Sequence, residues 1–342
     1  MKPSRNIYFI NELDFETKNA AYKARFDICQ SLKNESYLEI LDVPLWGTLI
    51  KRICKLPKFL YYIFFHIKKN DIVIMQYPFP KPFIKIIRLF SHLKKFKISF
   101  LIHDVDILRG ENFNEDIMNL NSCNVNISHN LTMSNKLSSL GITSDFVEIG
   151  LFDYLISRRS PEYIVSNNAV VYCGNLKKEK SLFIYDWMSR GFDRIVYGVN
   201  NTQDIELNNI YKGSFDPNSP PQVNIKNKAK VFGLVWDGLS VDECSGNYGE
   251  YLRYNNPHKT SLYLAMGIPI IIWKHAAISQ YLLKHNVCIT IDKLDDINSI
   301  FDNLTEEKYQ ELSTSVNNLR QEVINGVNTQ RAVEELVSKL EV

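Results

Sequence analysis

Short apolar runs alternate with longer amphipathic stretches along the first half of the chain. The short runs are rich in β-branched and aromatic residues, which predicts strands at 6–10, 37–43, 71–77, 97–105, 124–129 and 145–149. Between them apolar residues recur at helical spacing, which predicts helices near 18–33, 48–68, 82–95, 112–121 and 132–140. Strands that are separated by helices and apolar on both faces are typical of a parallel sheet covered on both sides. The pattern therefore predicts an α/β fold.

A polar stretch at 152–168 interrupts this alternation, and we interpret it as a linker between two domains. After it the alternation resumes, with strands predicted at 169–173, 194–199, 209–212, 230–236, 269–273 and 287–291. Helices are predicted near 179–189, 219–224, 259–266, 276–285 and 294–303, followed by two long amphipathic helices within 305–342. In a protein of two α/β domains the ligand is expected in the cleft between them, beside the carboxyl ends of the strands.

The composition restricts the class of protein. The chain has 342 residues, 45% of them hydrophobic, which is enough for about two domains with full cores. A net charge of only +2 argues against a dedicated nucleic-acid binder. The six cysteines are scattered without metal-like spacing, which favours a reducing cytosol over a disulfide framework. We find no signal-peptide pattern and no apolar run of the roughly 20 residues that a membrane span needs, so a cytoplasmic location is expected.

The longest apolar run, at 59–67, has basic residues on both sides. A basic, aromatic-rich segment can lie on an anionic membrane surface. It can equally be a buried helix whose terminal lysines face solvent, and the pattern alone leaves both interpretations open.

The segment 251–273 carries the strongest functional signal. A polar loop broken by Asn and Pro leads into a predicted helix, and Lys259, Thr260 and Ser261 fall where that helix begins. Unpaired backbone N–H groups and a partial positive charge make a helix start an anion site, to which the lysine adds a full charge. A Gly-Ile-Pro turn then leads into a buried strand. The segment predicts a phosphate site for a nucleotide or a sugar nucleotide.

A second signal lies at the end of the strand predicted at 97–105, where His103, Asp104 and Asp106 follow apolar residues. A carboxylate there can remove the proton of an attacking hydroxyl group, and a histidine can do the same or orient it. The alternative is a structural role, as a helix N-cap beside a hydrogen-bonded histidine. The position at the carboxyl end of a strand favours catalysis.

Several further turns can contact a sugar nucleotide, because most of them follow predicted strands. A glycine permits close approach of the backbone, a lysine can meet a phosphate, and an aromatic ring can stack on a base. The residues concerned are Thr17, Asn19, Gly174, Asn175, Lys178, Phe215, Asp216, Pro217, Asp237 and Asn256. Each of them can also belong to an ordinary surface turn.

Several common catalytic motifs are absent from the sequence. There is no GxxxxGK[ST] phosphate loop, no HExxH, no GxSxG and no kinase signature. No acidic pair lies in a setting that we would assign to a metal, and no cofactor is predicted.

Long strings of residues resemble one family over nearly the whole chain. They include FINELDF at 9–15, LIHDVDILRG at 101–110, ISHN at 127–130, YCGNL at 172–176, FGLVWDG at 232–238 and NNPHKTSLYLAMGIPI at 255–270. In these strings the chain resembles the bacterial β-1,6-galactofuranosyltransferases of O-antigen synthesis, lipopolysaccharide enzymes that use UDP-galactofuranose. More distantly it is similar to the streptococcal adhesin glucosyltransferases.

The resemblance implies a GT-B fold, with two Rossmann-like domains and an interdomain cleft. Residues 1–152 would bind the acceptor and residues 168–324 the UDP-sugar, with a helix at about 325–342 packing back on the first domain. The resemblance also implies that no metal is used. The UDP contacts that it implies fall near Thr17, Lys178, Phe215, Asp216 and Pro217, and at the turn formed by Pro257, His258, Lys259, Thr260 and Ser261.

One position departs from a pattern found in many retaining GT-B enzymes. Those enzymes carry a Glu–x7–Glu pair before the small-x-Gly-x-Pro turn, and the second Glu position is Leu262 here. UDP-galactofuranose is an α-linked donor, so a β product requires inversion, with one base and a stabilised leaving diphosphate. We predict Asp104 as the base, with its two neighbours named above as alternatives, and Lys178 and Lys259 as groups that stabilise the leaving UDP.

The chain is therefore interpreted as an inverting, metal-independent glycosyltransferase. It would move β-galactofuranose from UDP-galactofuranose to O6 of an α-glucosyl residue in a lipid-linked O-antigen or polysaccharide intermediate. The nearest alternative is a UDP-glucose-dependent glucosyltransferase acting on a glycan or glycoprotein, and alternatives of other classes are a non-catalytic UDP-sugar-binding subunit and a UDP-sugar epimerase. Expected partners are the donor, the acceptor, the inner face of the cytoplasmic membrane as a peripheral contact, and a second copy of the chain. Nucleic acid is not expected as a partner.

Overall fold

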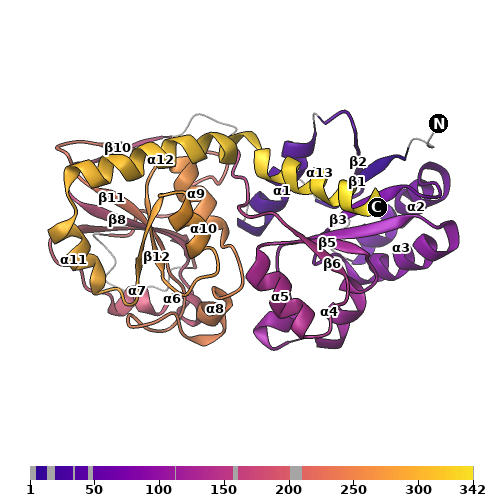
Figure 1. Ribbon diagram of the computed structural model, residues 1–342, viewed down its shortest axis with the longest axis horizontal. Coiled ribbons are helices and arrows are strands. Elements are labelled where there is room, and N and C mark those ends of the chain that lie inside the picture. The colour runs from indigo at the N-terminus through magenta and orange to yellow at the C-terminus, as the bar shows by residue number, and fades with distance from the viewer. Residues whose placement is uncertain are drawn as a thin grey trace. The chain divides into compact units, whose positions relative to one another are not determined.

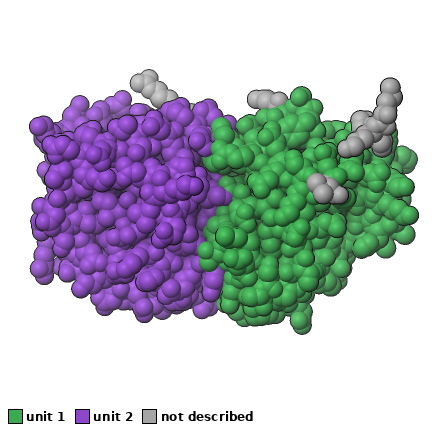
Figure 2. Space-filling model, viewed as in Figure 1, with its two compact units in different colours: residues 1–149, 326–342 green, residues 150–325 purple. Residues whose placement is uncertain are grey.

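The computed structural model describes residues 5–13, 20–33, 35–44, 49–111, 113–156, 161–200 and 210–341. The chain divides into two compact units, one formed by residues 1–149 together with 326–342 and the other by residues 150–325 (Figure 2). Each unit has a parallel sheet and a hydrophobic core of its own.

The first unit is built on a six-stranded parallel sheet in the order β2-β1-β3-β4-β5-β6 (Figure 1). The strands are β1 (Ile7–Asn11), β2 (Glu39–Asp42), β3 (Ile72–Tyr77), β4 (Lys97–Ile102), β5 (Val125–Ser128) and β6 (Asp145–Glu148). Every residue of β1, β3 and β5 is buried, as expected for strands with helices on both faces. The helices are α1 (Ala20–Leu32), α2 (Leu49–Tyr61), the π-helix η1 (Tyr62–His66), α3 (Lys81–Lys94), the 3-10 helix η2 (Asp106–Arg109), α4 (Phe113–Leu120), α5 (Leu131–Ser139) and α13 (Val327–Glu341).

The helix α13 belongs to the first unit although the whole second unit precedes it in the chain. Its apolar side packs against α1, β5 and β6, and includes the buried side chains of Val333, Leu336 and Leu340. The ammonium of Lys97 donates a hydrogen bond to the carbonyl of Leu340, which places a cation at the negative end of the helix. The last helix of the chain therefore covers part of the sheet of the first unit.

The second unit holds a five-stranded parallel sheet in the order β13-β12-β11-β8-β9 and a separate parallel pair, β10-β7. The strands are β7 (Glu162–Val165), β8 (Ala169–Asn175), β9 (Asp193–Val199), β10 (Gln222–Ile225), β11 (Val231–Val235), β12 (Ile270–Trp273) and β13 (Cys288–Ile291). The helices are α6 (Lys178–Ser181), α7 (Phe183–Asp186), α8 (Gly246–Tyr251), α9 (His258–Met266), α10 (Ser279–Lys284), α11 (Asp296–Asn303) and α12 (Glu306–Asn325).

Three sequence-based predictions in the second unit are wrong. The helix predicted near 219–224 is instead the strand β10, because Pro220 and Pro221 bring the chain into it in an extended conformation. The polar stretch at 152–168 is more than a linker, since it contains β7, the partner of β10. The strand predicted at 209–212 is, within the described residues, reduced to a single bridge between Tyr211 and Val196.

Candidate active site

Tyr263 fixes α9 against the sheet of the second unit. Its ring fills the space above Gly233 of β11, where an added Cβ would lie 2.1 Å from the ring. Its hydroxyl group donates a hydrogen bond to the carbonyl of Leu234 (3.0 Å) and accepts one from the backbone N–H of Cys173 (2.9 Å). Glycine at 233 and tyrosine at 263 therefore tie α9 to both central strands and place its first turn at their carboxyl ends.

Lys259, in that first turn, forms a buried ion pair. Its ammonium lies 2.8 Å from Oδ1 of Asp237, donates to the carbonyl of Trp236 (3.1 Å), and sits 4.5 Å from the ring centroid of Tyr172. Burial lowers the pKa of Lys259, while Asp237 acts in the opposite direction. The side chain is 9% exposed, so its charge is directed into the unit and is largely compensated there.

Thr260 and Ser261 place two hydroxyl groups in the same turn. Both residues are buried, and neither Thr260 Oγ1 nor Ser261 Oγ has a hydrogen-bond partner among the described residues. The residue before the helix, Pro257, provides no side-chain cap for the first N–H groups. Buried polar groups are normally hydrogen-bonded, so this turn has donors available for an anion.

Asn256 and His258 have structural partners. The amide of Asn256 donates to the carbonyl of Gly150 (2.8 Å), and Nε2 of His258 lies 3.2 Å from the carbonyl of Asp153. The imidazole ring also packs 5.0 Å from the ring of Tyr154. These two predicted site residues thus hold the segment that enters the second unit beside the start of α9.

The turn after β8 is ordered by Asn175, whose Oδ1 accepts hydrogen bonds from the backbone N–H of Lys177 (3.1 Å) and the amide of Asn200 (3.0 Å). Gly174 ends the buried part of the strand, and Lys178 opens α6 with an exposed side chain.

Lys180 in α6 is a basic residue that the sequence analysis did not single out. Its ammonium lies 5.3 Å from the ring centroid of Tyr248, and its charge contributes to lowering the pKa of Lys259. It is therefore close to the paired lysine. The three lysines in KKEK at 177–180 were the signal in the sequence.

The Phe215 turn lies beside the end of β9. The ring of Phe215 meets that of Tyr197 edge-on at 5.5 Å and remains half-buried. Asp216 accepts a hydrogen bond from the N–H of Asn218 (3.0 Å), and the carbonyl of Pro217 accepts one from Tyr154 (2.8 Å). The contact with Tyr197 and these two hydrogen bonds thus fix the position of the Phe215 turn.

In the first unit, the predicted catalytic residues follow β4. Oδ1 of Asp104 lies 2.6 Å from Nη2 of Arg109, and the aspartate side chain is 46% exposed. The ion pair orients a carboxylate that solvent still reaches. Asp106 begins η2 and, with Asp104, borders a hollow of about 50 Å³.

His103 is connected to a buried network of polar side chains. Nε2 of His103 lies 2.7 Å from Oε1 of Gln76, whose amide nitrogen faces the carbonyl of Arg25 (3.3 Å). This arrangement puts an imidazole proton on Nε2. Arg25 in turn pairs with the buried carboxylate of Glu12 and donates to the carbonyl of Pro78 (2.9 Å). This network was not predicted from the sequence, although a glutamine inside the apolar strand β3 was a signal for it.

His129, in the ISHN string, is also fully buried and lies after β5. Burial lowers its pKa to about 4, so the ring is neutral at physiological pH. Its Nε2 lies 3.1 Å from the carbonyl of Ile102, at the end of the strand that precedes the candidate base. Thr17 and Asn19, two predicted donor contacts, lie outside the described residues.

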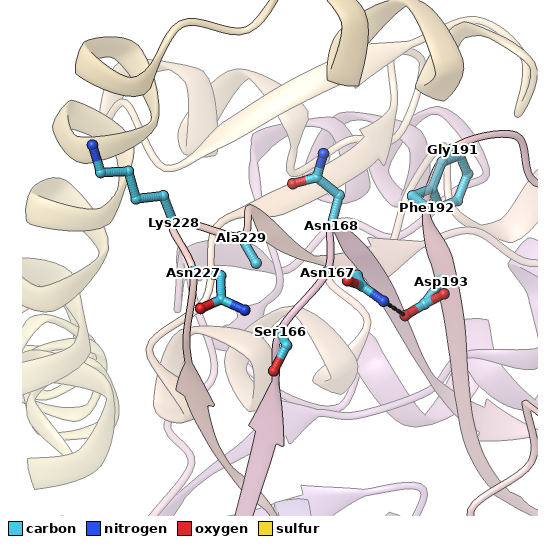
Figure 3. Close-up of a pocket in the computed structure, with 9 residues that line it drawn as sticks. All are labelled: Ser166, Asn167, Asn168, Gly191, Phe192, Asp193, Asn227, Lys228 and Ala229. Atoms are coloured by element: carbon cyan, nitrogen blue, oxygen red, sulfur yellow. Dashed lines mark hydrogen bonds between the residues drawn. The ribbon is translucent and has the colours of Figure 1, made fainter.

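A separate hollow of about 510 Å³ lies at the opposite edge of the second sheet (Figure 3). Asn168 and Asp193 stand there at the amino ends of β8 and β9, and Asn167 donates to Asp193 (3.2 Å). Ligands of parallel α/β sheets bind at the carboxyl ends of the strands. None of the predicted site residues lines this hollow.

Neither a metal site nor a membrane span is found among the described residues. No group of three or more His, Cys, Asp or Glu side chains is arranged to hold a metal ion. Within the same residues, no helix combines the length and the apolarity of a membrane span.

Two α/β units, each built on a parallel sheet, define the GT-B fold. The fold is shared with sucrose-phosphate synthase from Thermosynechococcus elongatus, at a TM-score of 0.63 and 10% identity over 98% of this chain and 99% of that one. It is also shared with Anabaena HepE, solved with UDP and glucose, at a TM-score of 0.57 and 12% identity over 98% and 100% of the chains.

The sequence comparisons identify the family. Residues 6–151 match the N-terminal domain of the glucosyltransferase 3-like family and residues 170–336 match its C-terminal domain. The chain is 35% identical to β-1,6-galactofuranosyltransferase WbbI of Escherichia coli (strain K12), over 98% of this chain and 99% of that protein. It belongs to the glucosyltransferase 3-like family and is a glycosyltransferase, as the resemblance in the sequence predicted.

Proposed function

We propose that this protein transfers β-galactofuranose from UDP-galactofuranose to O6 of an α-glucosyl residue in a lipid-linked O-antigen or polysaccharide intermediate. The observation that carries the proposal is the start of α9, where two buried hydroxyl groups and an uncapped helix end offer a site for the donor diphosphate. The name of the Escherichia coli relative supports the sugar and the linkage. The UDP and glucose bound to HepE support a UDP-sugar as the donor class.

The proposed reaction is a single inverting displacement. Asp104 takes the proton from the acceptor 6-hydroxyl, and the oxygen attacks C1 of the galactofuranosyl group. The bond from C1 to the β-phosphate oxygen breaks, and UDP leaves with that electron pair. The α-linked donor thus gives a β-linked product. Arg109 orients the base through the 2.6 Å ion pair, and His103 and Asp106 stay as alternative bases.

We propose that the second unit binds the donor and the first unit the acceptor. The half-buried ring of Phe215 would stack on the uracil ring, and the other predicted contacts would surround the ribose and the diphosphate. Lys178 and Lys180 would stabilise the departing UDP without a metal, while Lys259, paired with Asp237, would hold the start of α9 in place beside them. Leu262, at the position where many retaining enzymes carry glutamate, is buried in α9, which is consistent with inversion.

A lipid-linked acceptor would bring the enzyme to the inner face of the cytoplasmic membrane as a peripheral protein, and we propose that it acts there as a homo-oligomer. The nearest alternative is transfer of glucose from UDP-glucose to a glycan or glycoprotein. A non-catalytic UDP-sugar-binding subunit would bind the donor and release no UDP when an acceptor is added.

The test is a transfer assay with an alkyl α-glucoside as acceptor. UDP-galactofuranose, UDP-galactopyranose and UDP-glucose are offered in parallel, with EDTA present, and the products are read by NMR. A β-furanoside at O6 is expected. Transfer from UDP-glucose alone would replace the donor proposal, and UDP binding without transfer from any donor would contradict the enzymatic proposal for this acceptor.

The same assay tests the base. Asp104→Asn should lower turnover by roughly 10²–10⁴-fold and leave UDP affinity within a few-fold, because the base acts on the acceptor. Asp302→Asn, a change at the exposed end of α11, is the control and should keep the native rate. A near-native rate for the Asp104 variant, with a large loss in Asp106→Asn or His103→Gln, would move the role to that neighbour.

A further inference from the structure

Basic residues are concentrated in one part of the first unit. The segment 43–103 contains twelve Lys and Arg residues and a single acidic residue, Asp71, whereas the rest of the chain contains 28 basic and 37 acidic residues. The carboxylate of Asp71 is buried and accepts hydrogen bonds from the backbone N–H groups of Asn6 (3.0 Å) and Lys68 (2.7 Å). It is therefore used inside the fold and does not neutralise the lysines at the surface.

The helices of this segment pack side by side (Figure 1). Phe59 of α2 and Phe83 of α3 are buried with their ring centroids 5.1 Å apart. Farther along, the ring of Phe64 in η1 lies 4.7 Å from that of Phe90 in α3, and the ammonium of Lys94 donates to the carbonyl of Ile63 (2.6 Å). The outer sides of α2, η1 and α3 thus form one continuous surface, which we call the α2–α3 surface.

Large apolar side chains project from the α2–α3 surface into solvent. Phe65 is 73% exposed and Leu93 is 66% exposed. Among the described residues of the first unit, six of the nine exposed large hydrophobic residues lie here: Ile53, Tyr61, Phe64, Phe65, Leu89 and Leu93. Isolated exposed apolar residues are ordinary, but a contiguous group marks a surface that meets something else.

Exposed lysines lie on the same helices and in the short segments that follow them. They are Lys58, Lys68, Lys69, Lys85 and Lys95. Within the described residues, no carboxylate forms an ion pair with any of them. The long stem of a lysine can lie along an apolar surface while its ammonium reaches outward. The α2–α3 surface therefore offers aromatic rings and uncompensated positive charge together.

The combination of exposed apolar side chains and lysines indicates which kind of partner the α2–α3 surface binds. A second copy of the same surface would bring like charges together, which disfavours self-association through it. A nucleic acid would satisfy the lysines but would leave the leucines and the isoleucine in water. An anionic bilayer satisfies both, because aromatic and aliphatic side chains enter the interfacial region while lysines meet the lipid phosphates.

We propose that the α2–α3 surface docks the protein on a membrane that contains anionic phospholipids. The proposal deepens the proposed function, because a lipid-linked acceptor is presented at such a surface, but lipid binding itself needs neither donor nor acceptor. Contact is peripheral and electrostatic in part, so it weakens as salt screens the lysines.

The test is co-sedimentation of the full-length protein with vesicles of phosphatidylcholine, with or without phosphatidylglycerol. Binding is expected only to the anionic vesicles and should fall on raising the salt concentration. The double variants Phe65→Ser/Leu93→Ser and Lys68→Glu/Lys69→Glu should each weaken binding by about tenfold or more, through lost insertion and lost charge respectively. Because all four side chains are solvent-facing, the fold should be retained, which the thermal unfolding temperature checks.

Two control variants carry single changes of the same two kinds elsewhere. Leu131→Ser alters an exposed leucine of α5, and Lys284→Glu alters an exposed lysine of α10, and both should bind vesicles like the parent protein. No binding to anionic vesicles, or equal losses in the surface and control variants, would overturn the proposal. UDP affinity and transfer to a soluble glucoside should be unchanged in the surface variants, so a failure of the proposed function would be seen separately in those assays.

Discussion

At the scale of single residues, the hydroxyl groups of Thr260 and Ser261 are the sharpest test of the donor site. Both are buried without partners, so a bound diphosphate would supply the missing acceptors. Thr260→Val keeps the shape of the side chain and removes the donor, and we expect UDP to bind about 5–10-fold more weakly, near 1–1.5 kcal/mol for one hydrogen bond. Calorimetric titration with UDP measures this.

The matched control is Thr314→Val, which removes an exposed hydroxyl group of α12 in the same unit. It should leave UDP affinity unchanged. If Thr260→Val bound UDP as tightly as the parent while Thr314→Val did the same, the hydroxyl group of Thr260 would have no part in donor binding. Ser261→Ala then tests the second hydroxyl group separately.

Residue identities in the candidate site were readable from the sequence, but partners were not. Lys259 stood out because it begins a predicted helix. Its pairing with Asp237 depends on β11 and α9 being brought together by the sheet, across 22 positions of the chain. The same holds for Gln76 and His103, which come from neighbouring strands. A lysine that looks free in the sequence is, in the fold, half of a buried ion pair.

At the scale of elements, Gly233 and Tyr263 couple β11 to α9. A Cβ at position 233 would overlap the tyrosine ring, so Gly233→Ala must displace the helix or the strand. We expect a loss of unfolding free energy of about 1–3 kcal/mol, as for overpacking of a core. Urea unfolding of the variant measures it, and UDP affinity should fall in parallel because the start of α9 moves.

Comparing the stability of Gly233→Ala with its UDP affinity distinguishes an effect on core packing from an effect on donor binding. If stability fell and UDP affinity did not, the position of α9 would not matter for donor binding. If neither changed, the close approach of the ring to the strand would be relieved elsewhere at no cost.

Elements with strong periodicity were predictable, and short ones were not. The apolar strands β3, β4, β8 and β11 and the two helices of the tail match the sequence-based interpretation closely. The pair β7 and β10 was missed because each is a short strand that directly follows proline, Pro161 before β7 and Pro221 before β10. Such short strands form only because they pair with each other, and the local sequence of one strand does not identify its partner.

At the scale of the whole molecule, the first unit depends on α13. A chain that ends at Asn325 would leave exposed the faces of α1, β5 and β6 that α13 covers. The loss of several buried apolar side chains, at about 2–5 kcal/mol each, is comparable to the full stability of a domain. We expect the first unit to unfold in this variant and the second unit to stay folded.

Hydrogen exchange read by mass spectrometry distinguishes the two units in one experiment. Amides of β1 and β4 should lose protection in the truncated chain, while those of β8 and β11 should keep it. The milder variant Leu336→Ala should reduce protection in the first unit only. Retained protection of β1 and β4 after truncation would show that the first core is stable without its last helix.

The position of α13 also sets an order for biosynthesis. Residues 150–325 are contiguous, so a ribosome delivers the whole second unit in one stretch. The first unit must wait for its final helix while the 176 residues from 150 to 325 are added, which takes roughly 9–35 s at about 5–20 residues per second. During that interval a nascent chain presents the uncovered apolar face of the first sheet. The first unit is therefore translated first but completed last. Of the two units, it is the one most in need of chaperones.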